Sequence, residues 1–241
     1  MKFFLAPMQG LTGYTVRNAF HHNFDYIDKY YTPFIPAAKR MNAKIKRDID
    51  PVNNDGITLI PQAMSIVADE VIDLHRQLVP YGYDEINVNL GCPSGTVVSK
   101  KRGSGILAYP DMLDSFLDEL YAKADFPVSI KTRVGFNDDE LWPKLIEIYS
   151  KYPISELTVH PRVQKDFYKN TPRMDDFALA MQKINPDKTT LCYNGDITDT
   201  NSFNALTDCF PDIDEIMIGR GLFANCLLYT SDAADDRISV D

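Results

Sequence analysis

Eight short runs of β-forming residues, each separated from the next by a helical pattern, constrain the fold of this chain most strongly. The runs are Phe3–Ala6, Tyr26–Lys29, Leu59–Gln62, Glu85–Asn89, Val128–Lys131, Glu156–His160, Thr190–Asn194 and Glu215–Gly219. Strands that alternate with helices form right-handed βαβ units and a parallel sheet, and eight such units suggest a closed barrel. A doubly wound open sheet is the alternative, but the usual Gly-x-Gly-x-x-Gly turn is absent after the first run, where Ala6-Pro7-Met8-Gln9-Gly10 stands. We therefore predict an α/β fold of the (β/α)8, or TIM-barrel, type.

Two of the helical patterns carry an apolar stripe of the kind that packs on a sheet. The stripes are Val67, Val71, Leu74 and Leu78, which stop near Pro80, and Leu113, Phe116, Leu117 and Leu120. Apolar residues three and four positions apart share one helix face, so both stripes are predicted to belong to the core.

Length and composition favour a single domain. The chain has 241 residues, of which 44% are hydrophobic, and barrels of this length are commonly one domain. No stretch approaches the ~20 apolar residues of a membrane span, so we expect a cytoplasmic protein. We also expect a monomer that binds neither a membrane nor a metal. The four cysteines, Cys92, Cys192, Cys209 and Cys226, lie far apart, which predicts reduced thiols rather than disulfides or a metal site.

Charge limits how this chain can contact a nucleic acid. A formal net charge of −9 argues against a phosphate-binding surface that covers the whole molecule. Two basic clusters stand out, Lys39, Arg40, Lys44, Lys46 and Arg47 in one segment and Lys100, Lys101 and Arg102 in another. Each supports either a local phosphate contact or ordinary solvated loop charge.

Polar or glycine-containing groups follow nearly every predicted strand. In order they are Ala6-Pro7-Met8-Gln9, Gln62, Asn89 through Cys92, Lys131 with Arg133, His160 with Arg162, Asn194-Gly195-Asp196 and Gly219-Arg220-Gly221. The carboxyl ends of barrel strands meet at one rim, where the active sites of such barrels lie. These groups therefore predict an active site.

Cys92 is the strongest single indication of chemistry at this rim. It sits where a strand opens into a loop, and a thiol exposed there can serve as an acid, whereas a lone cysteine elsewhere is more often a packing residue. Gly195, Gly219 and Gly221 would let backbone N–H groups approach a phosphate, with Arg220 adding a charged contact, or would simply permit tight turns.

Two further groups suit a planar heteroaromatic ring. Gln62 offers a donor and an acceptor to its edge, and Lys131 can steady negative charge there, so flavin mononucleotide (FMN) fits these demands. Lys131 could instead form a Schiff base, and Arg133 would lower its pKa in either role. His160 is either a core histidine or, with Arg162 beside it, a ligand or phosphate contact, and its strand-end position favours the latter.

Taken together, the motifs resemble the tRNA-dihydrouridine synthase family, flavin enzymes with an FMN-bearing barrel followed by a small helical domain. The matching segments are Ala6 to Thr12, Asn89 to Pro93 with Gly103-Ser104-Gly105, Lys131 to Gly135, His160 to Arg162, Asn194 to Asp196 and Met217 to Gly221. Gln9 stands where the family usually has glutamate, and Pro161 where it usually has glycine.

The resemblance implies a division of labour. Cys92 would give a proton to C5 of a uracil ring in tRNA while reduced FMN delivers hydride to C6 and NADPH recharges the flavin. The implied cofactor-binding residues are Pro7, Met8, Gln9, Gln62, Lys131, His160, Asn194, Gly195, Asp196, Gly219 and Arg220. The candidates for holding the flipped base and the tRNA are Asn89, Arg133, Arg162, Lys100, Lys101 and Arg102.

The end of the chain departs from the family pattern. From Cys226 onward it resembles translated sequencing-adapter sequence, so we expect a catalytic domain over residues 1–225 and a non-native or disordered tail over 226–241, a genuine divergent terminus being the alternative. The eighth helix and the helical domain would then be missing, and tRNA binding would be weak.

Three other functions remain open at this point. They are another FMN barrel acting on a small molecule, of the dihydropyrimidine or dihydroorotate dehydrogenase type, a Schiff-base lyase using Lys131, and an inactive fragment that still binds flavin.

Overall fold

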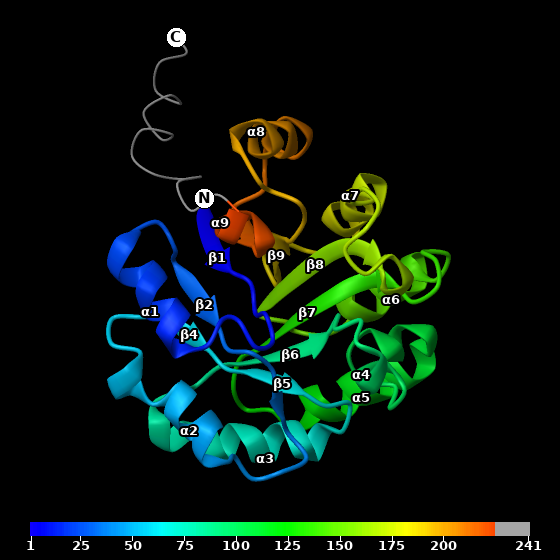
Figure 1. Cartoon of the computed structure of the whole chain (residues 1–241). Helices are drawn as coiled ribbons and strands as arrows, with labels where there is room; N and C mark the ends of the chain where they lie inside the picture. Colours follow the sequence, from blue (N-terminus) through cyan, green and yellow to red (C-terminus); the bar gives the residue numbers. More distant parts are fainter. Residues whose placement is uncertain (225–241) are drawn as a thin grey trace.

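Parallel strands alternate with helices that surround them, which confirms the predicted fold class (Figure 1). The computed structural model describes residues 1–224; the expected absence of an eighth helix and the tail expected over 226–241 concern residues outside this part. The strands are β1 (Lys2–Leu5), β2 (Lys29–Tyr31), β3 (Ile35–Pro36), β4 (Leu59–Ile60), β5 (Gln62–Met64), β6 (Ile86–Leu90), β7 (Val128–Gly135), β8 (Glu156–Val163), β9 (Thr190–Tyr193) and β10 (Glu215–Ile218). The helices are α1 (Tyr14–Asn23), α2 (Ala43–Ile49), α3 (Ala68–Leu78), α4 (Gly95–Val98), α5 (Pro110–Lys123), α6 (Trp142–Ser150), α7 (Met174–Lys183), α8 (Thr200–Cys209) and α9 (Arg220–Ala224).

The strand order returns to its starting point. The sheet runs β3-β5-β6-β7-β8-β9-β10-β1-β2-β4, and β4 and β5 are one stretch of chain interrupted only at Pro61. β4 pairs with β2 on one side and β5 pairs with β6 on the other, so the sheet closes into a cylinder. Proline has no N–H for a sheet ladder, which explains why this strand is divided at Pro61.

The structure moves several strand boundaries from their predicted positions. The second strand begins at Lys29, where the prediction ended, because the buried pair Tyr30 and Tyr31 continues the ladder beside β4. β7 and β8 run several residues further than predicted, which places Arg133 and Arg162 on strands. Their pairing is irregular past Arg133, on the stretch of β8 that contains Pro161.

The hydrophobic core has two separate parts. The larger part lies between the barrel and its helices and includes both predicted stripes, except that Val67 precedes α3 and is 44% exposed. The smaller part fills the barrel interior with Phe4, Ala6, Tyr31, Ile60, Cys192 and Met217. Among residues 1–224, no helix is long and apolar enough to span a bilayer.

A layer of charged residues closes the barrel interior at the amino-terminal ends of the strands. Lys29 Nζ donates to Glu156 at 2.7 Å, and the hydroxyl of Tyr31 donates to the same carboxylate at 2.7 Å. Lys2 pairs with Glu215 at 3.1 Å. Burial, together with the charge of Glu156, raises the pKa of Glu215. The apolar layer therefore separates this charged floor from the opposite rim.

The start of α7 carries a carboxyl group whose pKa is unusually high. Burial and the neighbouring carboxylate of Asp139 raise the pKa of Asp176 to about 7. The folded chain therefore keeps a proton on Asp176 up to about pH 7, whereas the unfolded chain loses it near the ordinary value of 3.8. Because the folded state binds the extra proton, the contribution of this group to stability is full below pH 4 and is lost as the pH rises to 7.

Replacing Asp176 by Asn is expected to remove that pH dependence. The amide copies the protonated acid, so the variant should match the parent at pH 5 more closely than at pH 8, where it should be more stable by about 1 kcal/mol once solvent screening is allowed for. Urea unfolding of both proteins at the two pH values measures this difference. An Asp175→Asn variant is the control, and equal pH dependence in Asp176→Asn and the parent would contradict the assignment.

Candidate active site

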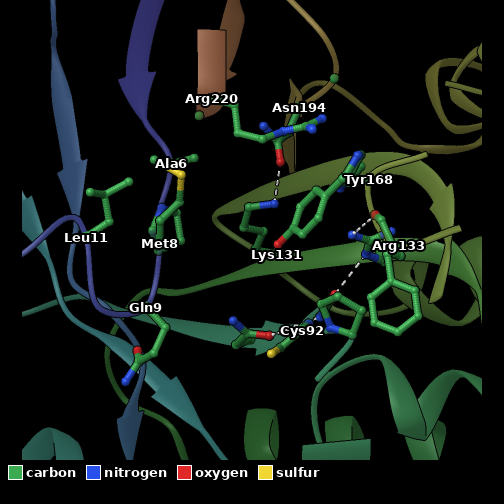
Figure 2. Close-up of a pocket in the computed structure, with 18 of the residues that line it drawn as sticks. Ala6, Met8, Gln9, Leu11, Cys92, Lys131, Arg133, Tyr168, Asn194 and Arg220 are labelled. Carbon is green, nitrogen blue, oxygen red and sulfur yellow. Dashed lines mark hydrogen bonds between the residues drawn. The ribbon is translucent and has the colours of Figure 1, made fainter. Parts of the chain in front are cut away.

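A cavity of about 860 Å³ opens at the carboxyl ends of the strands, as the sequence predicted for the active site. Its wall includes every predicted cofactor-binding residue, together with Cys92, Asn89 and Arg133 (Figure 2). The other residues of the wall are Ala6, Leu11, Phe34, Gly91, Pro93, Ser94, Phe167, Tyr168, Thr198, Gly221 and Ala224. Residues distant in the sequence thus meet at one mouth, which is large enough for a cofactor and part of a substrate.

Cys92 follows β6 and is held by its neighbours on both sides. The backbone N–H groups of Gly91 and Cys92 donate to the side-chain oxygen of Asn89, at 3.1 and 2.9 Å. The carbonyl of Cys92 accepts from the backbone N–H and hydroxyl of Ser104, at 3.1 and 2.8 Å. Gly103 adopts φ +54°, and a Cβ there would meet the Cys92 carbonyl oxygen at 2.7 Å. A glycine is therefore required where this segment packs on the cysteine.

The thiol of Cys92 is protonated at neutral pH. Burial raises its pKa above the ordinary value of 9.0, and this outweighs the hydrogen bond from Ser94 and the positive charges of Arg133 and Lys131. A thiol with such a pKa is a poor nucleophile, because thiolate is the reactive form, but it keeps a proton available at the cavity wall. The site is thus suited to proton donation rather than to attack by sulfur.

Lys131 lies on β7 and points across the cavity to the end of β9. Its Nζ donates to the side-chain oxygen of Asn194 at 2.5 Å (Figure 2). The Asn194 amide donates in turn to the carbonyl of Met217 at 2.7 Å. Burial, then the charge of Arg133, lowers the pKa of Lys131 to about 7. The predicted effect of Arg133 is therefore confirmed, although burial contributes more.

Gln62 and Asn89 form one chain of amides beneath the cavity. Asn89 donates to the Gln62 oxygen at 2.7 Å, and Gln62 donates to Asn87 at 2.8 Å. Each bond fixes which end of the amide faces its neighbour. A single N–H of Gln62 is left for a ligand, and Asn89 is committed to the Cys92 turn.

Two of the three arginines predicted to touch substrate, Arg133 and Arg162, are deeply buried. Arg133 uses all of its nitrogens on backbone carbonyls, of Gly91 at 3.0 Å, Val163 at 3.0 Å and Phe167 at 2.7 Å. It lines the cavity but also ties the Cys92 turn to the loop after β8. Arg162 does not line the cavity: it pairs with Asp196 and with the carbonyls of the loop that follows β8.

His160 lies at the cavity wall and is nevertheless only 8% exposed. Burial, then the charges of Arg133, Lys131, Arg162 and Arg220, lowers its pKa well below 6.5, so the ring is neutral. Its Nε2 lies 3.1 Å from a guanidinium nitrogen of Arg162 and accepts from it, which leaves the other ring nitrogen as the N–H donor. Both sequence interpretations of His160, burial and a place in the site, therefore apply.

Of the predicted glycine cradle, only Gly219 is open toward the cavity. A Cβ on Gly219 would make ordinary contacts with Ala6 and Met8, at 3.4 and 3.6 Å. A Cβ on Gly195 would lie 2.0 Å from the Tyr193 hydroxyl, and one on Gly221 would lie 1.8 Å from the Ile197 carbonyl. Gly195 and Gly221 are thus needed for close packing of the chain itself, which brings the loops after β9 and β10 together.

The basic segment after Cys92 lies outside the cavity wall. Arg102 pairs with Glu70 at the start of α3, at 3.1 Å, and the Lys101 ammonium sits 4.3 Å above the Tyr109 ring. Lys100 is exposed. The structure therefore places all three beside the site rather than in it. Among residues 1–224, no group of three or more His, Cys, Asp or Glu side chains is placed to hold a metal ion.

A family model described as dihydrouridine synthase (Dus) matches residues 4–238. This chain belongs to the dihydrouridine synthase family. It is 27% identical over 237 residues to tRNA-dihydrouridine synthase B of Pasteurella multocida, covering 95% of this chain and 68% of the relative. It is 26% identical over 235 residues to a probable tRNA-dihydrouridine synthase of Staphylococcus aureus, covering 92% and 69%.

Two solved structures share the architecture at low sequence identity. An aldolase named QR15 superposes with a TM-score of 0.60 at 9% identity, covering all of this chain and 97% of that one. The 2-keto 3-deoxygluconate aldolase from Picrophilus torridus gives 0.57 at 12% identity, covering 92% and 75%. At these identities the likeness shows the barrel fold that this dihydrouridine synthase family member adopts.

The structure adds an aromatic pair that the sequence analysis of this dihydrouridine synthase family member missed. Phe167 and Tyr168 follow β8, line the cavity and are about half exposed. The Tyr168 ring lies 5.5 Å from the guanidinium of Arg133 and 4.8 Å from that of Arg220 (Figure 2). Both residues lie in a loop, where the sequence has neither helix nor strand periodicity. Two adjacent aromatic residues, Phe167-Tyr168, were therefore the only sequence signal for this part of the site.

Proposed function

We propose that this chain reduces a uridine in tRNA to dihydrouridine, with Cys92 as the proton donor. The observation that carries the proposal is the protonated thiol of Cys92 at the wall of a cavity whose other groups suit a flavin and a pyrimidine. The names of the two relatives, both tRNA-dihydrouridine synthases, supply the substrate class.

The residues of the cavity fit FMN. Gln62 has a free N–H for a ring edge, Lys131 offers an amine at the same wall, and Gly219 with Arg220 leaves room and charge for a phosphate. When bound in its reduced form, FMN supplies the hydride that C6 of the uracil ring receives. NADPH as the reductant, a monomeric state and a cytoplasmic location remain predictions of the sequence analysis.

The chain's own residues account for the remaining steps. The Cys92 thiol gives its proton to C5 of the uracil ring, and the fixed turn made by Asn89 and Ser104 keeps the sulfur at the cavity wall. Asn89 and Arg133 line the cavity on the Cys92 side, and each has a side-chain N–H beyond those used in the bonds described above that the base can accept. Tyr168 offers a ring face on which a base taken out of its stack can rest.

The test combines a spectrum with a product assay. The purified chain is incubated with FMN, passed through gel filtration and examined for flavin absorbance, and it is then given NADPH and an unmodified tRNA transcript. Bound flavin and dihydrouridine in the tRNA are the expected results. A protein that takes up no flavin, or one that reduces free uracil or orotate but never tRNA, would contradict the proposal.

A Schiff-base lyase is a second candidate, because the pKa of about 7 leaves much of Lys131 as free amine at neutral pH. Borohydride treatment in the presence of pyruvate would then attach the substrate's carbon skeleton to Lys131, which mass spectrometry detects. The flavin function predicts no such adduct.

Replacing Tyr168 by Ala is expected to lower the catalytic efficiency with tRNA and to leave flavin binding unchanged. Loss of a stacking face costs about 1–3 kcal/mol, so Tyr168→Ala should lower kcat/KM for tRNA by roughly 5- to 100-fold. Tyr168→Phe keeps the ring and is expected to stay within about threefold of the parent. Steady-state dihydrouridine formation measures both, and equal losses in the two variants would assign the effect to the hydroxyl instead.

A further inference from the structure

The positive charges of this chain divide into two sets, those neutralised by carboxylates and those left unpaired. On or next to α5, α6 and α7, which follow β6, β7 and β8, the ammonium groups have carboxylate partners. The pairs are Lys144 with Asp111, Lys151 with Asp114, Lys123 with Asp69 and Glu119, and Lys183 with Glu147. These pairs leave α5, α6 and α7 themselves without an unpaired ammonium group.

A second set of cations has no carboxylate within 4.0 Å anywhere in residues 1–224. Besides Lys131 and Arg133 of the cavity wall, it includes Lys39, Arg40, Lys44, Lys46, Arg47, Lys100 and Lys101, and these seven are exposed. We call these seven residues the basic flank. Lys165, Lys169 and Lys188 are also unpaired within the same range, but they lie elsewhere, after β8 and before β9.

Contacts with α3 bring the two segments of the basic flank to the same side of the barrel. Before Lys39, the backbone N–H of Ala37 donates to the carbonyl of Met64 at the end of β5, and after Arg40 that of Met41 donates to Gln77 on α3. About two turns earlier on the same helix, Arg102, which follows Lys101, pairs with Glu70 in the first turn. In Figure 1, α2 and α3 lie next to each other on the side away from α8 and α9.

The basic flank also lies next to one end of the cavity. Cys92 follows β6, and β6 lies diametrically across the closed strand order from β10, whose end carries Gly219 and Arg220. Figure 2 shows Cys92 and Arg220 at opposite sides of the cavity. The flank therefore adjoins the end where the proton donor lies, not the end that suits the cofactor phosphate.

We propose that the basic flank binds the phosphate backbone of tRNA next to the target uridine. The inference rests on the proposed function and adds the route by which the substrate reaches Cys92. In a chain with a net charge of −9, most of the surface repels a polyanion, so seven unpaired cations gathered beside the proton donor determine where RNA can approach. The side of α5 to α7, whose cations are paired, stays free of RNA.

The test compares two triple variants that change the net charge equally. Lys39→Gln/Lys44→Gln/Lys100→Gln removes three members of the basic flank, and Lys144→Gln/Lys151→Gln/Lys183→Gln removes three paired lysines on or next to α6 and α7. Affinity of the full chain for an unmodified tRNA transcript is measured across a series of salt concentrations. The flank variant should bind about 10- to 100-fold more weakly near 0.1 M salt, with a slope of log K against log salt shallower by about 2. The control variant should stay within about threefold.

The remaining outcomes would contradict either this inference or the proposed function. Equal losses in the two variants, or a parent chain that binds no tRNA, would overturn the inference. So would a flank variant that keeps its tRNA affinity but loses binding to phosphatidylserine vesicles, since the flank would then serve an anionic membrane. Flavin absorbance and dihydrouridine formation are recorded on the same samples. RNA binding through the flank without any dihydrouridine would refute the proposed function alone, and dihydrouridine formed equally well by both variants would refute this inference alone.

Discussion

Replacing Cys92 by Ala is expected to reduce the rate of dihydrouridine formation by about 10²- to 10⁴-fold, the usual contribution of a positioned general acid. The variant keeps the backbone bonds that form the turn, because Asn89 and Ser104 contact main-chain atoms of residue 92. Flavin absorbance and tRNA affinity should therefore match the parent. The measurement is dihydrouridine formed per minute at saturating tRNA, with bound flavin as the reference for intact protein.

The pH dependence separates proton donation from other roles of this cysteine. Because burial raises the pKa of the thiol above 9.0, its proton is present throughout the range from pH 6 to 8.5, and the rate should be flat there as far as Cys92 is concerned. It should fall only at higher pH, as thiolate forms. Cys209→Ala removes an exposed cysteine and should leave the rate unchanged. A Cys92→Ala variant within threefold of the parent would show that the proton comes from elsewhere.

The fold was predictable because its signals are local and repeat. Runs such as Val128–Lys131 show the apolar alternation of a strand, and stripes such as Leu113 with Leu117 show the period of a helix, so eight repeats identify the barrel without knowledge of any contact. The boundaries were less predictable. Tyr30 and Tyr31 continue β2 because of their partners on β4, and that pairing is not visible in the residues themselves.

The site was predictable to the extent that strand ends converge. Cys92, Lys131 and Asn194 end up at one cavity because parallel strands of a barrel all end at the same rim. What a side chain does there depends on burial and partners. Arg162 lies near the carboxyl end of its strand, as Arg133 does, yet its guanidinium is bound by Asp196 and loop carbonyls. The loop conformation that places Tyr168 over the cavity has no sequence periodicity.

The charged floor of the barrel predicts the second large effect, on stability. Replacing Lys29 by Met removes the cation 2.7 Å from Glu156, whose side chain is only 4% exposed, and so leaves a buried carboxylate without its partner. Breaking such a pair costs about 3–5 kcal/mol. Tyr31 and Thr158 still donate to Glu156, so we expect the lower end, about 3 kcal/mol, corresponding to a fall in Tm of roughly 6–12 °C for a chain of this size.

The cost should depend on pH in a defined direction. Burial raises the pKa of Glu215 and of Glu85 near the same floor, so these groups take up protons more readily than exposed glutamates as the pH falls. Less negative charge then remains for Lys29 to neutralise, and the loss caused by Lys29→Met should be smaller at pH 5 than at pH 8. Urea unfolding of parent and variant at both pH values gives the two differences.

A second substitution distinguishes two causes of the stability loss in Lys29→Met, the missing ion pair with Glu156 and the missing packing contacts of Lys29. Adding Glu156→Gln to Lys29→Met removes the unpaired charge while keeping an oxygen that Tyr31 can reach, so the double variant should recover more than half of the lost stability. Lys123→Met, which breaks two exposed pairs, with Asp69 and Glu119, should change stability by less than about 0.5 kcal/mol. If the double variant were no more stable than Lys29→Met, the stabilising role of Lys29 would lie in the contact of its ammonium with the Phe4 ring, 4.7 Å away, rather than in neutralising Glu156.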